Sequence, residues 1–259
     1  MLTLAGDILN WTAAGIVFPL MFLPAAALIA HGRGRSTALW FVGVAAIIAA
    51  GLTFAALAPA LRITPPVQAL LVYFTIVAAL GGAIFLAGGP AGAIAFLSPL
   101  LDRFVRTTGR TVMWLILVMA GVQFAIVVLR YVFGVNFIFM QESITYMHGA
   151  VFLLAGGYAL LTDDHVRVDI FYRDAPPKHK ALVDFLGTYF LLFPVCLLLL
   201  WTASPYVGVS WSVTEGSAES SGIQGVYLLK SLVPAFAILL AMAGFTNAAR
   251  AGDILKAGA

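Results

Sequence analysis

Few ionisable side chains lie within the long apolar runs of this sequence, and each of them needs a chemical explanation. An ionisable group near the centre of a bilayer costs about 2.5–3.5 kcal/mol on insertion scales. Arg130 lies near the end of one apolar run, and Glu142 opens the next run after a short turn. The turn brings the two helix ends together. We therefore predict either an Arg130–Glu142 ion pair or two side chains that reach water separately.

Lys230 lies about two turns inside the last apolar run. Its long stem favours snorkelling to the membrane surface. The alternative is a partner carboxylate, which is either Glu215 or Glu219 in the preceding loop or a group on another subunit. Pro234 follows one turn later, removes one helical hydrogen bond and is expected to kink the helix near this lysine.

His148 is the one histidine inside an apolar run. A haem group would need a second axial histidine from another run, and a metal ion would need further ligands at matching depth. We therefore expect His148 to be a packed, hydrogen-bonded residue. The sequence contains no Walker, GxGxxG, HExxH or GxSxG pattern. It predicts no catalytic residue, no metal ligand and no cofactor.

His165, Arg167 and Asp169 form a polar group between two apolar runs, directly after Asp163 and Asp164. Such a group could hold a metal ion. The basic residues in the same segment favour local salt bridges or contacts with lipid phosphates instead.

The elements that must position these residues are long apolar helices. Of the 259 residues, 62% are hydrophobic and 10% are charged, whereas a soluble domain is about half apolar and a quarter charged. Lipid must therefore surround most of the chain, and an open sheet cannot exist in lipid. We predict an all-α, polytopic transmembrane bundle. Seven apolar runs have the length of a span: 11–30, 38–60, 67–89, 111–133, 141–161, 181–203 and 224–249.

The basic residues give this bundle an orientation. Of the 14 lysines and arginines, all but Arg62, Arg130 and Lys230 fall on one side of an alternating seven-span arrangement. Positive charge marks the cytoplasmic side. We therefore predict a periplasmic N-terminus and a cytoplasmic C-terminus. Two segments, 91–110 and 163–180, mix apolar with basic residues and are expected to include helices that lie in the headgroup layer.

The part of the chain from about residue 112 to residue 250 resembles the small, DctQ-like permease subunit of TRAP (tripartite ATP-independent periplasmic) transporters. Three motifs carry the resemblance: LRYVFG at 129–134, FMQE at 139–142 and HVRVDIFY at 165–172. The segments MHG at 147–149, EGSAE at 215–219 and GVYLLKSLVP at 225–234 resemble one branch of the family. Two positions depart from the family pattern, because Phe139 stands where tryptophan is usual and Gln141 replaces the first of two glutamates.

The resemblance implies a subunit that is not an enzyme and lies in the bacterial inner membrane as a multi-pass protein. It implies a sodium-coupled transporter for organic, carboxylate-type solutes. The implied partners are a large elevator-type permease subunit, a periplasmic solute-binding protein and membrane lipids, with no nucleic acid. In such a complex the small subunit is a fixed scaffold beside the large one and contributes to docking of the binding protein.

The resemblance also divides the chain. We predict a three-span N-terminal extension with an interfacial segment at 1–105 and a four-span core at 106–259. The nine candidate interface residues are Arg130, Glu142, His148, His165, Arg167, Asp169, Glu215, Glu219 and Lys230. A different class of protein, a membrane subunit that binds quinone or a redox group, is the alternative that His148 and the tryptophans leave open.

Overall fold

The computed structural model describes residues 17–29, 84, 88–165 and 172–257, and the regular elements in these ranges are helices. Four of the described helical segments are long and apolar enough to cross a membrane: Pro90–Val132, Ile138–Thr162, Pro177–Ser212 and Val226–Ala257. The prediction of an all-α, multi-span membrane protein is confirmed. The predicted runs at 38–60 and, apart from residues 84, 88 and 89, at 67–89 lie outside the described residues.

The longest helix, α6 (Pro90–Val132), contains the segment that was expected to lie in the headgroup layer. At 1.5 Å per residue its 43 residues extend about 65 Å, roughly twice the thickness of the hydrocarbon core. Residues 91–110 are therefore the first half of one continuous helix and not a separate interfacial helix. Pro99 lies inside it without ending it. The expected division between residues 105 and 106 falls within this helix.

A five-residue connection joins α6 to α7 (Ile138–Thr162). Gly134 has a φ of 67°, a left-handed conformation that glycine adopts without strain. At the other end of α7, Asp163 adopts a φ of 62° and donates its backbone N–H to the carbonyl of Ala159. This left-handed cap ends the helix.

The third long segment consists of α8 (Pro177–Gly187), the π-helical turn η2 (Thr188–Leu192) and α9 (Phe193–Ser212). Pro194, the second residue of α9, leaves one carbonyl of the preceding turn without its usual donor. The ring of Tyr189 in the π-helical turn packs against Phe193 of α9 and against Phe22 between the two N-terminal helices.

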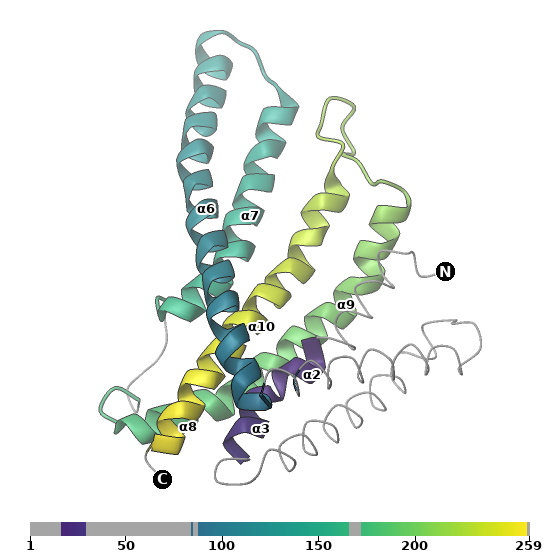
Figure 1. Ribbon diagram of the computed structural model, residues 1–259. Coiled ribbons are helices and arrows are strands. Elements are labelled where there is room, and N and C mark those ends of the chain that lie inside the picture. The colour runs from purple at the N-terminus through teal and green to yellow at the C-terminus, as the bar shows by residue number, and fades with distance from the viewer. Residues whose placement is uncertain (1–16, 30–83, 85–87, 166–171, 258–259) are drawn as a thin grey trace, which may run out of the picture.

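The last helix, α10 (Val226–Ala257), lies at the centre of the described bundle and contacts α3, α6, α7, α8 and α9 (Figure 1). Its buried residues are mostly alanine and glycine, which let neighbouring helices approach closely. A side chain at Gly244 would meet Leu192 and Phe193 on the neighbouring helix. Gly157 of α7 lies against the backbone of Leu239 in the same way.

Two short helices near the N-terminus, α2 (Phe18–Met21) and α3 (Leu23–Ile29), pack against this bundle. Buried Leu23 and Ala26 contact Ala93 of α6 and Phe245 of α10. The hydroxyl of Tyr189 donates to the carbonyl of Met21 at 2.7 Å and accepts the backbone N–H of Ala25 at 3.0 Å. These two backbone groups would otherwise bond each other, because Ala25 lies four residues after Met21. The inserted hydroxyl thus accounts for the interruption at Phe22.

The described bundle has two ends with different chemistry (Figure 1). One end holds the connections 133–137 and 213–225, and we refer to it as the loop end. The other end holds residues 163–165, residues 172–176 and the C-terminal part of α10, and we refer to it as the basic end. The described basic residues of this end are Arg103, Arg106, Arg110, Arg173, Lys178, Lys180, Arg250 and Lys256.

Candidate functional site

The loop at 213–225 has no regular structure, yet Glu142 ties it firmly to α7. The Glu142 carboxylate accepts the hydroxyl of Ser217 on one oxygen. Its other oxygen accepts the backbone N–H of Ile223 at 2.6 Å. Gly222 lies so close that a methyl group there would meet the Glu142 carboxylate. One carboxylate on α7 therefore fixes both arms of the loop.

The predicted ion pair between Arg130 and Glu142 is not formed. Both residues lie in the described part of the chain, and Glu142 is engaged with the 213–225 loop instead. The Arg130 guanidinium lies over the ring of Tyr131, 6.0 Å from its centroid, on an exposed part of α6. The pair does not form because the Glu142 side chain lies on the face of α7 that points to α10 and not on the face that points to α6. Seven residues farther along, on the same face, Gly149 packs against α10 and not against α6.

Lys230 ties the same loop to α10. Its ammonium group lies 2.5 Å from the Glu215 carboxylate and 4.2 Å from the centroid of the Tyr206 ring. The structure thus selects Glu215 from the two carboxylates that the sequence offered, while Glu219 is exposed at the tip of the loop. The hydrogen bond from Lys230 holds the pKa of Glu215 below its ordinary value.

An aromatic pair completes the loop end. The indole N–H of Trp211 donates to the hydroxyl of Ser231 at 2.8 Å, and the ring packs edge-on against Tyr227 at 4.9 Å between centroids. Tryptophan and tyrosine prefer the boundary between hydrocarbon and headgroups. The loop end of α9 and α10 therefore has the composition of a membrane boundary.

The basic end is organised around Asp102, which was not among the predicted candidates. This carboxylate accepts Arg106 of the same helix at 2.7 Å and also pairs with Arg250 of α10. The Asp102–Arg106 spacing is a helical i, i+4 pair that is visible in the sequence. The contact with Arg250 joins residues 148 positions apart, so no local sequence pattern predicts it.

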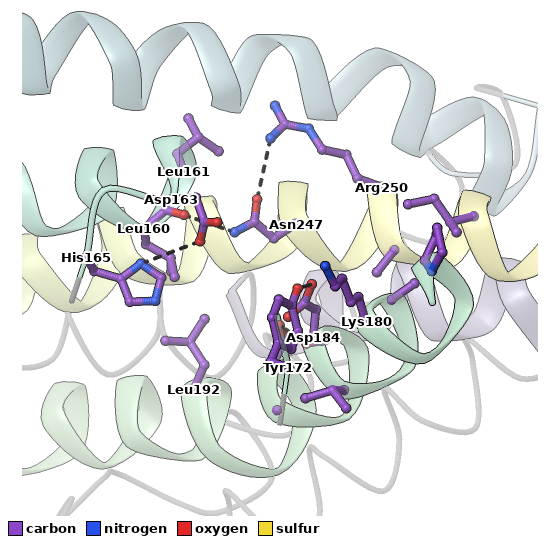
Figure 2. A pocket seen from close by; sticks show the side chains of 17 residues that line it. Leu160, Leu161, Asp163, His165, Tyr172, Lys180, Asp184, Leu192, Asn247 and Arg250 are labelled. Carbon is purple, nitrogen blue, oxygen red and sulfur yellow. Dashed lines mark hydrogen bonds and ion pairs between the residues drawn. The ribbon is translucent and has the colours of Figure 1, made fainter. Parts of the chain in front are cut away.

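A cavity of about 560 Å³ opens between α7, α8 and α10 at the basic end (Figure 2). The polar groups around it are engaged with one another. Tyr172 donates to Asp184 at 2.7 Å, Asn247 donates to the carbonyl of Leu160 at 3.2 Å, and Lys180 donates to the carbonyl of Arg173 at 2.8 Å. These hydrogen bonds among the polar residues labelled in Figure 2 link the chain segments at this end of the bundle.

The polar group at 165–169 is described only in part. The imidazole of His165 lies 4.0 Å from the Asp163 carboxylate, as expected for a local charge contact. Arg167 and Asp169 lie outside the described residues. Among the residues that are described, no group of three or more His, Cys, Asp or Glu side chains is placed to hold a metal ion.

His148 does not pack inside the bundle. It is exposed on the outer face of α7 and stacks on Phe152 with 6.2 Å between ring centroids. Within the described residues His148 therefore has neither the packing nor the hydrogen bond that the sequence led us to expect. The inner faces of α7 are occupied by glycines against α10 and by Tyr158 against Gly109 of α6, so no space remains there for an imidazole.

A comparison of the sequence with models of protein families identifies the family to which these features belong. Residues 119–252 match the family model described as "Tripartite ATP-independent periplasmic transporters, DctQ component". The match covers just over half of the chain and spans most of the loop-end contacts as well as α7, α8 and α9. No curated protein and no solved structure matches the chain. The chain belongs to the DctQ family, and it is a small permease subunit of a TRAP transporter, a multi-pass component of the bacterial inner membrane and not an enzyme.

Proposed function

We propose that this small permease subunit is a fixed scaffold beside a large, elevator-type permease subunit and that its loop end contributes to docking of the periplasmic binding protein. The family works as a tripartite system of a small permease, a large permease and a binding protein. In this proposal the loop end faces the periplasm and the basic end faces the cytoplasm, in agreement with the distribution of lysine and arginine.

The observation that carries the scaffold role is the polarity of the interior. In the described chain, the buried polar side chains are those of four hydroxyl residues, and none of them is charged: Thr188, Ser204, Ser210 and Thr246. A path for a sodium ion or an organic anion needs charged groups, unwound backbone or water-lined surfaces at mid-membrane depth. The scaffold role follows because these described helices offer little that could coordinate a transported solute.

The outer surface supports the same role. Large apolar side chains along α6 are exposed, including Trp114, Leu117 and Phe124. Contiguous apolar surface of this kind is suited to the lipid around a fixed scaffold. The charges at the basic end oppose movement of the subunit through the bilayer, because each arginine would have to leave the headgroup layer.

The sodium coupling and the class of solute come from the family resemblance. We propose a symporter for organic carboxylates in which the large subunit and the binding protein recognise the solute. The uncharged interior of the described helices supports this assignment, because it offers no charged group that could recognise a carboxylate solute.

The docking role is supported by the construction of the 213–225 loop. Glu142 and Lys230 hold its two ends on α7 and α10, while its tip at residues 218–221 is exposed. A loop that is already ordered loses little conformational entropy when a partner binds. Such a loop is suited to recognition of a folded protein.

Replacement of Glu142 tests this docking role. Glu142→Gln keeps the size of the side chain and removes the charge that strengthens its hydrogen bonds to Ser217 and Ile223. We expect several-fold weaker binding of the solute-binding protein to the reconstituted complex, with unchanged recovery of the large subunit. The measurement is the Kd of the binding protein on complex in nanodiscs.

Glu219→Gln is the matched control, because it removes a carboxylate of the same loop that is exposed and holds nothing in place. A Glu142→Gln complex that docks the binding protein as well as the wild type would remove the support for this role. So would an equal loss of docking in both variants, since that result would point to net charge and not to loop order.

The redox alternative gains no support from the described histidines. His148 faces outward and stacks on Phe152, and His165 lies beside Asp163 at the basic end. No second histidine of the described spans lies at the depth of His148.

A further inference from the structure

His148 lies at a depth where lipid does not accept an imidazole. It follows Ile138, the first residue of α7, by ten positions, which corresponds to about 15 Å along the helix. That distance is about half of the ~30 Å hydrocarbon core. A lysine or arginine can extend its charged group from such a depth toward water, but the short side chain of histidine cannot. An exposed histidine here needs a protein partner.

The surroundings of His148 within the described chain do not meet this need. The side chain is exposed, and its described contact is the stacked ring of Phe152, which is itself 73% exposed. A stacked phenylalanine covers one face of the imidazole and offers no lone pair to its N–H group. The described part of the chain therefore shows no donor or acceptor for the ring nitrogens of His148.

The residues that share this face of α7 have the composition of a helix–helix contact in a membrane. They follow one another at intervals of four and three positions, which keeps them on a single seam: Gln141, Thr145, His148, Phe152, Ala155 and Ala159. Small and hydrogen-bonding residues mark contacts between membrane helices, because lipid tails provide no hydrophobic drive for association.

The exposed surface of α6 differs from this seam. Its central residues Trp114, Leu117 and Phe124 are 67–71% exposed, and all three are large and apolar. Such side chains are satisfied by lipid alone. The two neighbouring helices thus present one surface suited to lipid and one seam suited to another protein.

We infer that the α7 seam is the contact face for a membrane helix of the large permease subunit, and that this helix presents a hydrogen-bonding group to His148. The inference rests on the proposed function, because the large subunit is the membrane partner that the family supplies. Among the described residues, the N-terminal helices α2 and α3 pack against α6, α8 and α10 and not on the α7 seam.

Site-specific photocrosslinking tests the location. A photoreactive amino acid is placed at position 148 of the full chain, co-expressed with the large permease subunit, and at position 124 of α6 as the control. We expect a crosslink to the large subunit from position 148 and none from position 124. A crosslink from 148 to a second copy of this chain, or from 124 alone, would overturn the assignment.

Substitution of His148 tests the chemistry. His148→Leu suits lipid but cannot form a hydrogen bond, whereas His148→Gln retains a donor and an acceptor. Interhelical hydrogen bonds in membranes are individually modest, so we expect roughly three- to tenfold weaker retention of the large subunit for the leucine variant. The glutamine variant should retain most of the binding, and equal retention by both variants contradicts the role of hydrogen bonding.

The two levels of the proposal fail in different ways. If the wild-type chain does not co-purify with the large subunit, both the proposed function and the assignment of the α7 seam as the contact face are contradicted. If it co-purifies fully and position 148 gives no crosslink to the large subunit, only the assignment of the contact face is contradicted.

Discussion

At the scale of single residues, two charged side chains determine how the loop end is held. Glu142 accepts a hydroxyl and a backbone N–H from the loop, and Lys230 binds the carboxylate of Glu215. Each charged group lies near the end of its helix and is compensated within hydrogen-bond distance, as the cost of placing a charge close to lipid requires. Both charges thus order the loop at 213–225.

The pH dependence of this order follows from Glu215. Lys230 holds the pKa of Glu215 below its ordinary value of 4.5. The stabilisation by the pair is therefore complete above pH 4.5 and is lost as the pH falls through the lowered pKa. We expect hydrogen exchange in residues 213–225 to stay slow down to about pH 4.5 and to accelerate below it, beyond the intrinsic effect of pH.

Lys230→Met is the comparison for this experiment. Without the ammonium group, exchange in the loop should already be faster at pH 7, and the additional step at acid pH should be smaller, because only the Glu142 contacts with Ser217 and Ile223 remain to be lost. An identical profile for the variant and the wild type would mean that the Lys230–Glu215 contact does not order the loop.

Sequence reasoning identified these residues but assigned only part of their contacts. Lys230 and Glu215 are fifteen positions apart across one loop, and the sequence offered Glu215 and Glu219 as alternative partners beside the favoured snorkelling of Lys230. For Glu142 the sequence offered an ion pair with Arg130 or separate solvation of both side chains, because both residues lie at the ends of adjacent helices. Which way a side chain points around a helix depends on the packing of α7 against α10, and a single sequence does not contain that information.

At the scale of elements, α10 is the helix on which the other described helices pack. It meets α6 at the basic end, where Asp102 accepts both Arg106 and Arg250. The apolar patterns predicted the existence of the long helices, but they did not predict that residues 91–110 continue α6. Pro99 and the charges after it suggested a break, whereas packing against α3 and α10 supports one continuous helix.

Replacement of Asp102 tests this connection. Asp102→Asn removes the partner of two arginines, and breaking such a charge network costs about 1–3 kcal/mol when the site is partly shielded from water. The Asp102 side chain is 21% exposed. We expect a lower thermal midpoint in detergent, while Asp253→Asn, whose side chain is 72% exposed, should change it little. Equal midpoints for the two variants would contradict the role of Asp102.

The attachment of the N-terminal helices gives a second test at this scale. Tyr189→Phe removes the hydroxyl that lies between the backbone groups of Met21 and Ala25, while the ring keeps its contacts with Phe185 and Phe193. Two backbone groups then lose their partner, at a cost of about 1–2 kcal/mol. We expect faster protease cleavage within residues 17–29 and a lower thermal midpoint.

Tyr131→Phe is the matched control for this substitution, because the Tyr131 side chain is 79% exposed and lies on α6. If Tyr189→Phe is as resistant to protease as this control, the N-terminal helix closes its own hydrogen bond and does not need the tyrosine.

At the scale of the whole molecule, the chain combines a small-permease core with helices that lie outside the family match. Residues 17–29 are packed into the same apolar clusters as α8 and α10, so this part of the extension is structurally continuous with the core. We propose that the extension enlarges the scaffold. The three-span count and the periplasmic N-terminus remain predictions from apolar runs and charge, since residues 30–83 lie outside the described part.

The central claim is that this subunit holds its partner in place and transports nothing by itself. The most direct measurement is uptake of a radiolabelled organic carboxylate into liposomes that contain this chain alone, the large subunit alone, or both, each with the binding protein and an inward sodium gradient. The account predicts uptake when both membrane subunits are present and none with this chain alone. Sodium-dependent uptake by this chain without the large subunit would contradict it.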